Sequence, residues 1–201
     1  TLKYNKAADT FDRSKKPVAS AAPSVKAPDY WKQNFDNGMK LIGAKTDEVP
    51  SVTIQLTIEA GHRYEAIEKS GISQLLTSVM NESTQKSTAE EIAEKLERLG
   101  SSVSVNNNGQ DIVVYISSLT KNIDATLAIA EEILFQPKFD AKEFERIKKQ
   151  RIEAIANQST QATTIANNVF AKLLYGSKHI MSVSSLGTKE TSTKNEHVSE
   201  L

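Results

Sequence analysis

The 201-residue sequence contains no cysteine, which excludes disulfides and thiolate metal sites. The 25 Lys and Arg residues are balanced by 25 Asp and Glu residues, so the chain lacks the basic character of a nucleic-acid-binding protein. No apolar run is long enough to cross a membrane, and residues 1–30 lack the apolar core of a signal peptide. These absences leave the compartment open; a periplasmic or cell-envelope location is favoured if a longer parent protein carries its own signal peptide.

The start of the chain differs in composition from the rest. Pro17, Pro23 and Pro28 are spaced through Ala, Ser and Lys, a composition that cannot bury much apolar surface. We therefore predict an extended linker over residues 1–30 and one domain over residues 31–201. We also expect the sequence to be a piece of a longer, multi-domain chain.

Alternation of apolar and polar residues predicts four strands. Val52–Ile58 alternates strictly, and the short link before it predicts a hairpin with Met39–Ala44. Val103–Val105 and Ile112–Ile116 flank Asn108-Gly109, which is typical of a two-residue hairpin turn.

Helical spacing of apolar residues predicts five helices. Two of them begin with residue pairs typical of a capping box, Thr88 with Glu91 and Asp140 with Glu143. The predicted helices cover residues 72–79, 89–99, 122–135, 140–155 and 162–175. The order of elements indicates an α+β fold, in which an antiparallel or mixed sheet of at least four strands carries the helices on one face.

The stretch from Gly71 to Met80 is the most informative part of the sequence, because it resembles a known motif whose key residues are replaced here. It follows a predicted hairpin, precedes a capped helix, and resembles the zinc-binding helix of the insulinase (pitrilysin-type) peptidases, whose motif is H-x-x-E-H. On that helix two imidazoles at i and i+4 hold zinc and a Glu polarises the bound water. The resemblance places these three roles at Gln74, Thr77 and Ser78.

Further landmarks of this family occur in the same order along the chain. Each is weak alone, but together they span residues 37–187 with the family's order and spacing. They lie at 37–43, 99–105, 137–140, 174–176 and 185–187. The resemblance implies repeated domains of about this size, of which one half binds zinc and the other does not.

The substituted residues predict that this chain binds no zinc. A Gln amide and a Ser hydroxyl are poor ligands beside imidazole, and Thr cannot accept a proton near neutrality. The resemblance places the family's third ligand within Arg151–Ala154, where Glu153 is the candidate remnant. We expect no cofactor in this chain, and zinc in the presumed active half or partner.

A peptide-binding role can outlast the metal site. The resemblance implies that the edge strand, at Ser102, Val103, Ser104 and Val105, is where active relatives add a peptide by main-chain hydrogen bonds. The alternative is that a neighbouring domain covers this edge.

Other sites have weaker support. His62, His179 and His197 lie far apart and are interpreted as solvent-facing or capping residues, and the charged face of the helix that contains Arg151 is interpreted as a solvated surface. No G-x-S-x-G elbow or phosphate-binding loop is present.

Three functions remain open at this stage. The first is a catalytically inactive insulinase-type domain that pairs with a zinc-bearing half or subunit around an unfolded peptide. The second is a fragment of an intact zinc metalloendopeptidase whose active site lies outside this chain. The third is a domain repurposed for protein interaction.

Overall fold

A computed structural model describes residues 12, 14–16, 20, 28–46 and 48–194. The chain divides into two compact units, Thr1–Glu48 and Val49–Leu201. Most of the linker predicted over residues 1–30, and His197, lie outside the described residues.

The first unit contains a β-hairpin. Strand β1 (Tyr30–Asn34) pairs antiparallel with β2 (Lys40–Ala44), and the Trp31 ring lies so close to Gly43 that a Cβ there would be 2.3 Å from it. The hairpin predicted between Met39–Ala44 and Val52–Ile58 is therefore wrong. All five residues of β1 are exposed, so the strand has no apolar alternation by which the sequence could reveal it.

The second unit contains a three-stranded antiparallel sheet. Its order is β3 (Ser51–Ile58), β5 (Ile112–Leu119) and β4 (Ser102–Asn107). The α+β class is confirmed, but the described strands form sheets of three and two strands rather than one sheet of at least four. Four residues rather than two separate β4 from β5, because Asn107 is paired with Ile112.

Six α-helices are found among the described residues. The five predicted helices are present, with ends shifted by a few residues; α6, a single short helix near the end of the described chain, was not predicted. The helices are α1 (Ile72–Met80), α2 (Ala89–Leu99), α3 (Ile123–Phe135), α4 (Ala141–Gln158), α5 (Ala162–Tyr175) and α6 (Lys189–Lys194). Short 3₁₀ turns cover His62–Tyr64, Ile67–Lys69, Thr120–Asn122 and Ile180–Ser182.

The helix caps follow the sequence closely. Thr88 accepts from the Glu91 amide at 3.2 Å and Glu91 accepts from the Thr88 amide at 2.9 Å, which completes the capping box of α2. Asp140 accepts from the amides of Lys142 and Glu143 at the start of α4. The second box is not closed, because the Glu143 carboxylate accepts instead from the Ser83 hydroxyl.

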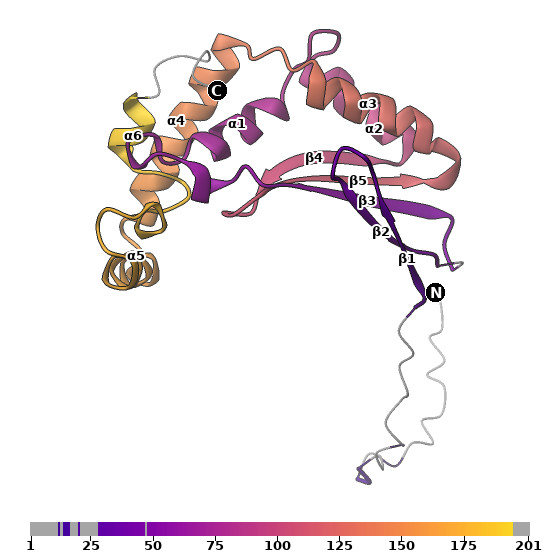
Figure 1. Cartoon of the computed structure of the whole chain (residues 1–201), viewed down its shortest axis with the longest axis horizontal. Helices are drawn as coiled ribbons and strands as arrows, with labels where there is room; N and C mark the ends of the chain where they lie inside the picture. The colour runs from indigo at the N-terminus through magenta and orange to yellow at the C-terminus, as the bar shows by residue number, and fades with distance from the viewer. Residues whose placement is uncertain (1–11, 13, 17–19, 21–27, 47, 195–201) are drawn as a thin grey trace, which may run out of the picture. The chain divides into compact units, whose positions relative to one another are not determined.

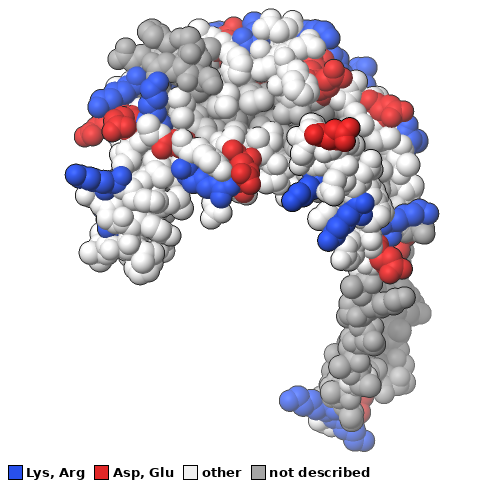
Figure 2. All heavy atoms as spheres, in the orientation of Figure 1, with Lys and Arg blue, Asp and Glu red and all other residues white. Residues whose placement is uncertain are grey.

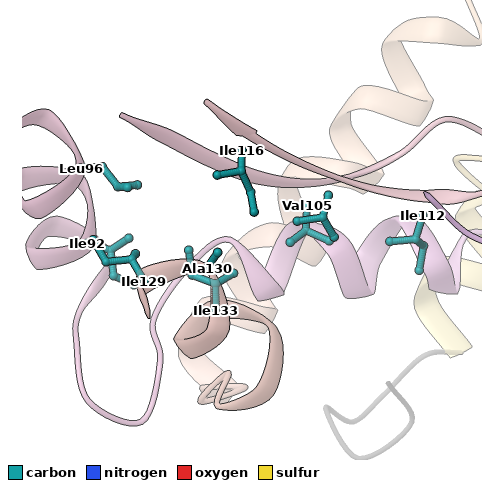
Figure 3. Close-up of a cluster of buried hydrophobic side chains, with 9 residues drawn as sticks. Ile92, Leu96, Val105, Ile112, Ile116, Ile129, Ala130 and Ile133 are labelled. Atoms are coloured by element: carbon teal, nitrogen blue, oxygen red, sulfur yellow. The ribbon is translucent and has the colours of Figure 1, made fainter. Parts of the chain in front are cut away.

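The core lies between one face of the sheet and the helices above it. Figure 1 shows α1, α2 and α3 on the same side of the three-stranded sheet. Inward-pointing residues of β4 and β5 meet α2 and α3 in the cluster of Figure 3, which comprises Ile92, Leu96, Val105, Ile112, Val114, Ile116, Ile129, Ala130 and Ile133. Burial of these side chains supplies the main driving force for folding of this unit.

A second, smaller cluster fixes α1 against α4. Leu75 and Val79 pack on Phe144 and Ile147, and all four side chains are at most 7% exposed. Since Leu75 and Val79 are one helical turn apart, they set the rotation of α1 and thereby the direction of Gln74 and Ser78. None of the described helices is long and apolar enough to cross a membrane.

Candidate functional site

The site suggested by the sequence lies where α1 passes between α4 and the edge of the sheet. Gln74 and Ser78 line a hollow of about 300 Å³ together with Glu82. Helix α4 and the loop before α6 supply the rest of the lining, through Ile147, Gln150, Arg151, Ala154 and Leu186. The structure thus brings two of the three motif positions to one surface opposite α4.

The third motif position, Thr77, is buried. Its side chain is 3% exposed, and its hydroxyl donates to the carbonyl of Gln74 at 3.1 Å. The Ser78 hydroxyl donates to the same carbonyl at 2.8 Å. Both hydroxyls are therefore engaged with their own helix and do not form a set of ligands.

The residues present do not fit zinc. Zinc sites in proteins use imidazole, thiolate and carboxylate ligands, whereas the α1 positions offer an amide and a hydroxyl. Within the described part of the chain no three His, Cys, Asp or Glu residues are grouped so that they could hold a metal ion.

The candidate remnant ligand lies away from the hollow. Glu153 is exposed on α4 and is not among the residues that line the hollow, whereas its neighbour Ala154 is. One residue step on a helix is a rotation of about 100°, which separates the directions of these two side chains. A ligand role for Glu153 in a restored site stays a prediction.

A buried ion pair stands beside this hollow, and the sequence did not reveal it. His62 is 2% exposed, and its Nδ1 lies 2.7 Å from Oε2 of Glu65, whose side chain is 3% exposed. Nε2 of His62 lies 3.1 Å from the carbonyl oxygen of Ile180 and 3.0 Å from that of Val183. Carbonyl oxygens only accept, so Nε2 carries a hydrogen, and a second one on Nδ1 suits the carboxylate. The interpretation of His62 as solvent-facing or capping is therefore wrong.

Glu65 also organises the start of α1. Its Oε2 accepts from the amide of Gly71 at 2.7 Å, and its Oε1 accepts from the amide of Ser73 at 2.8 Å and from the Ser73 hydroxyl. A carboxylate at this position satisfies amides that have no partner within the helix and interacts favourably with the helix dipole.

Arg151 completes the buried charges. It is 7% exposed, and its guanidinium donates to the carbonyl of Gly71. The interpretation of its helix face as a solvated surface is wrong at this position, because Arg151 points from α4 toward the start of α1. Burial lowers the pKa of Arg151 to about 10, opposed by the nearby Glu65 carboxylate.

The surroundings favour the charged forms of His62 and Glu65. The hydrogen bond from Glu65 raises the pKa of His62, although burial opposes the shift. Burial alone would raise the pKa of Glu65, but hydrogen bonds from His62, Ser73 and the Gly71 amide outweigh it and lower the pKa. The pair therefore joins the loop at Ile180–Val183 to the start of α1 through opposite charges.

The predicted peptide-binding strand is an edge of the three-stranded sheet, but it is partly occupied. The Asn81 carboxamide accepts from the amide of Val105 at 2.9 Å and donates to its carbonyl at 2.6 Å. Main-chain groups of alternate residues point outward from an edge strand, so Val103 is the next residue with outward groups. Those of Ser102 and Ser104 face β5. A peptide-binding role for Ser102–Val105 stays a prediction.

His179 differs from His62 in its surroundings. His179 accepts from the Met181 amide at 3.2 Å and stacks on Tyr175, so its interpretation as a capping residue is confirmed. Nothing in the sequence marked Asn81, Glu65 or Arg151 as structural residues. The partners of Asn81 and Arg151 are 24 and 80 positions away, and those of Glu65 depend on a turn that only folding creates.

Taken together, the described residues form an α+β domain in which α1 and α4 border a hollow, and they contain no group of His, Cys, Asp or Glu residues that could hold a metal ion. A family comparison agrees: the family described as "Insulinase (Peptidase family M16)" matches residues 41–181. The chain belongs to the insulinase family.

Individual relatives show the same family with differing names. An uncharacterized zinc protease, YmxG, of Bacillus subtilis is 28% identical over 155 residues, which are 77% of this chain and 38% of that protein. The non-peptidase homolog YmxG of Helicobacter pylori is 24% identical over 146 residues, covering 73% of this chain and 34% of the relative. Subunits of mitochondrial-processing peptidase from yeast and Arabidopsis also match.

The fold is shared with a solved structure. The peptidase M16 inactive domain from Pseudomonas fluorescens superposes with a TM-score of 0.75 at 22% identity, covering 81% of this chain and 39% of that chain. This chain therefore spans less than half the length of the relatives it matches.

Proposed function

We propose that this domain is a catalytically inactive insulinase-type domain that pairs with a zinc-bearing half or subunit to enclose a peptide. The observation that carries the proposal is the hollow between α1 and α4. The hollow lies between the two helices to which the resemblance assigns a zinc site, yet Gln74 and Ser78 offer only an amide and a hydroxyl there.

The chemistry of a zinc peptidase has no substitute in this hollow. Without metal, no water is activated at neutral pH and no substrate carbonyl is polarised. Gln150 and Arg151 do not supply a general base, since an amide does not accept a proton and a buried guanidinium stays charged. The one carboxylate in the lining, that of Glu82, is paired with the Arg146 guanidinium at 2.6 Å. The domain would instead form part of the surface that encloses the peptide, and zinc would lie in its partner.

Names among the relatives support this division of work. One solved neighbour is named an inactive domain and one curated relative a non-peptidase homolog. Others are named as alpha and beta subunits of one peptidase. We accordingly propose two partners for this chain, an active zinc-bearing half or subunit and an unfolded peptide. We propose no cofactor for the chain itself.

Metal analysis tests the proposal directly. The purified chain is dialysed with zinc and then against buffer, its metal content is measured, and cleavage of a quenched unstructured peptide is followed. We expect well below one zinc per chain and no cleavage. About one zinc per chain that is lost on Gln74→Ala or Ser78→Ala would refute the proposal, whereas a metal removed by His179→Ala would reflect adventitious surface binding.

A second function is favoured by the name of one relative. The Bacillus subtilis protein is called a zinc protease, and this chain matches only 38% of it. The parent polypeptide would then be an intact zinc metalloendopeptidase whose H-x-x-E-H helix lies outside this chain. One zinc per full-length polypeptide, with none in this chain, would support that arrangement over a separate active subunit.

A further inference from the structure

A second hollow lies between the end of α4, helix α5 and the loop that precedes α6. We call it the α4–α5 hollow. Its volume is about 210 Å³, smaller than the roughly 300–1,000 Å³ of sites for drug-sized ligands. Its lining includes six side chains that can donate a hydrogen bond: Thr164, Asn168, Lys172, Ser182, Ser184 and Lys189. A hollow of this size and polarity suits a small polar ligand.

The charge on this lining is positive. Lys172 lies on α5 and Lys189 is the first residue of α6, and no Asp or Glu lines the hollow. Within the described part of the chain, neither of these two ammonium groups forms a hydrogen bond or an ion pair. Lys172 is also the one charged residue of α5, and Figure 2 shows the lobe that contains this helix as mostly white. An anion in the hollow would therefore meet two cations without a competing carboxylate.

Ser182 supplies a donor that the fold does not use. It is 2% exposed, and its hydroxyl has no hydrogen-bond partner among the described residues. Buried hydroxyls are nearly always paired, because an unpaired one loses its hydrogen bonds to water without replacement. The loop around Ser182 is held in place, since the carbonyl oxygens of Ile180 and Val183 lie 3.1 and 3.0 Å from Nε2 of His62. The unused hydroxyl is therefore fixed in the wall of the hollow.

The end of α4 does not turn the hollow into a cation site. Free carbonyls at the C-terminus of a helix attract cations. The last four carbonyls of α4, at 155–158, are instead occupied: they accept from the amide and hydroxyl of Ser159, the hydroxyl of Thr160 and the amide of Gln161, at 2.6 to 3.0 Å. With these acceptors paired, the two lysines decide the charge preference of the hollow.

We propose that the α4–α5 hollow binds a phosphate group. A phosphate ester carries about −1.5 to −2 charges at pH 7 and three strong acceptor oxygens, which match two ammonium groups and a set of hydroxyl donors. Lysine binds phosphate as a point charge, whereas planar, bidentate recognition of a carboxylate is typical of arginine, which is absent from this lining. The size of the hollow suits inorganic phosphate or the phosphate of a small molecule. This site is independent of zinc and of any pairing with an active half.

Inorganic phosphate is the probe for the first test. Its affinity for the 201-residue chain is measured by titration calorimetry at constant ionic strength, beside Lys172→Ala and Lys189→Ala. Each substitution removes a charge-assisted hydrogen bond and should weaken binding by about tenfold or more. Lys178→Ala is the matched control, because Lys178 is exposed but does not line the hollow, and a change of less than about twofold is expected. The absence of saturable binding, or equal affinities of all three variants, overturns the proposal.

Ser182→Ala separates a ligand-binding role from a structural one. Removing a hydroxyl that has no partner should leave the melting temperature unchanged when phosphate is absent. It should weaken the binding of phosphate by about threefold or more, because one donor to the ligand is lost. A lowered melting temperature with unchanged phosphate affinity contradicts the proposal, since the partner of the hydroxyl would then lie within the fold.

Two further probes establish the chemistry and its source. Glycerol 3-phosphate carries the same group on a small molecule, and acetate carries a single negative charge on a carboxylate. Binding of glycerol 3-phosphate at least as tight as that of inorganic phosphate supports a phosphorylated small molecule as the ligand, and weaker binding supports inorganic phosphate itself. Acetate that binds as tightly as phosphate overturns the proposal, because two ammonium groups and several hydroxyl donors should favour the more highly charged anion.

Discussion

The Asn81 carboxamide forms a two-point bridge to Val105, accepting from its amide at 2.9 Å and donating to its carbonyl at 2.6 Å. The same nitrogen also donates to the carbonyl of Thr77 at 2.7 Å. One side chain therefore joins the end of α1 to the outer edge of β4 and takes the place that a further strand would occupy at Val105.

Replacing Asn81 should destabilise the unit and open this edge. Asn81→Ala leaves the buried main-chain groups of Val105 unpaired, which should cost about 1–3 kcal/mol in the free energy of unfolding. The measurement is urea denaturation followed by circular dichroism. Asn106→Ala is the matched control: its amide bonds only the Ser104 hydroxyl, and a change within about 0.5 kcal/mol is expected. Equal free energies of unfolding for the two variants would show that water replaces the bridge.

Peptide binding is a separate measurement on the same variant. Stronger binding of an extended peptide by Asn81→Ala than by the unchanged chain would support the predicted role of the edge strand.

Gly71 should be intolerant of alanine for two separable reasons. Its φ of +93° is unfavourable for other residues, and a Cβ would lie 2.6 Å from the carbonyl oxygen of Leu186. Gly109 has nearly the same φ, +92°, with nothing within 4 Å of a Cβ. Gly109→Ala should therefore cost about 1 kcal/mol, and Gly71→Ala should cost about 1–3 kcal/mol more, because the loop at Leu186 must move. The comparison uses the same denaturation measurement, and equal losses would mean that this loop is free to shift.

The His62–Glu65 pair should make stability depend on pH in a defined direction. The raised pKa of His62 adds stability that is complete below its ordinary value of 6.5 and is lost as pH rises through the raised value. The lowered pKa of Glu65 adds stability that is complete above its ordinary value of 4.5 and is lost as pH falls through the lowered value. The pair therefore contributes most between pH 4.5 and 6.5.

A substitution isolates this contribution. His62→Gln keeps hydrogen-bonding capacity but cannot be charged, so the decline in stability from pH 6 toward pH 9 should become shallower. The measurement is the free energy of unfolding at a series of pH values, with His179→Gln as the control, since His179 is exposed and lies outside the buried pair. An unchanged pH profile in His62→Gln would show that the ring is neutral in the folded protein.

Zinc capture should be restorable at the hollow, and the choice of third ligand is decisive. Gln74→His with Ser78→His places two imidazoles on the surface that faces Ala154. Adding Ala154→Glu should raise zinc affinity by at least about tenfold, since even an outer partner changes metal affinity by that much. Zinc affinity is measured by chelator competition, with Glu153→Ala in the two-histidine background as the comparison. A large loss of zinc affinity in the Glu153→Ala variant, with no gain from Ala154→Glu, would place the third ligand at Glu153, as the resemblance implied.

Restored zinc should not restore peptidase activity. Adding Thr77→Glu supplies the carboxylate that polarises water, but Thr77 is buried, and turnover also needs an oriented substrate strand and the second half. We expect no cleavage of a quenched peptide by the isolated variant. Robust cleavage would show that the enclosing partner is unnecessary, which contradicts the proposed role of this domain.

The sequence by itself determined the elements whose signals are local. The alternation of Val52–Ile58 gave β3, and Thr88 with Glu91 gave the start of α2, because a strand's face and a helix cap depend on neighbouring residues alone. The chemistry of Gln74 and Ser78 could also be read from the sequence: an amide and a hydroxyl one helical turn apart are poor zinc ligands, wherever the helix packs.

Only the tertiary structure decided which distant residues meet. The pairing of β2 with β1, the bridge from Asn81 to Val105, and the burial of His62 and Arg151 all depend on contacts between segments whose sequences carry no mark of one another. A charged residue on a helix is usually solvated, so Arg151 has the same local signal as its exposed neighbours, and only the approach of Gly71 distinguishes it. The exposure of Phe170 and Leu173 on α5 also depends on tertiary packing, because amphipathic spacing shows that a helix has an apolar side but packing decides where that side points.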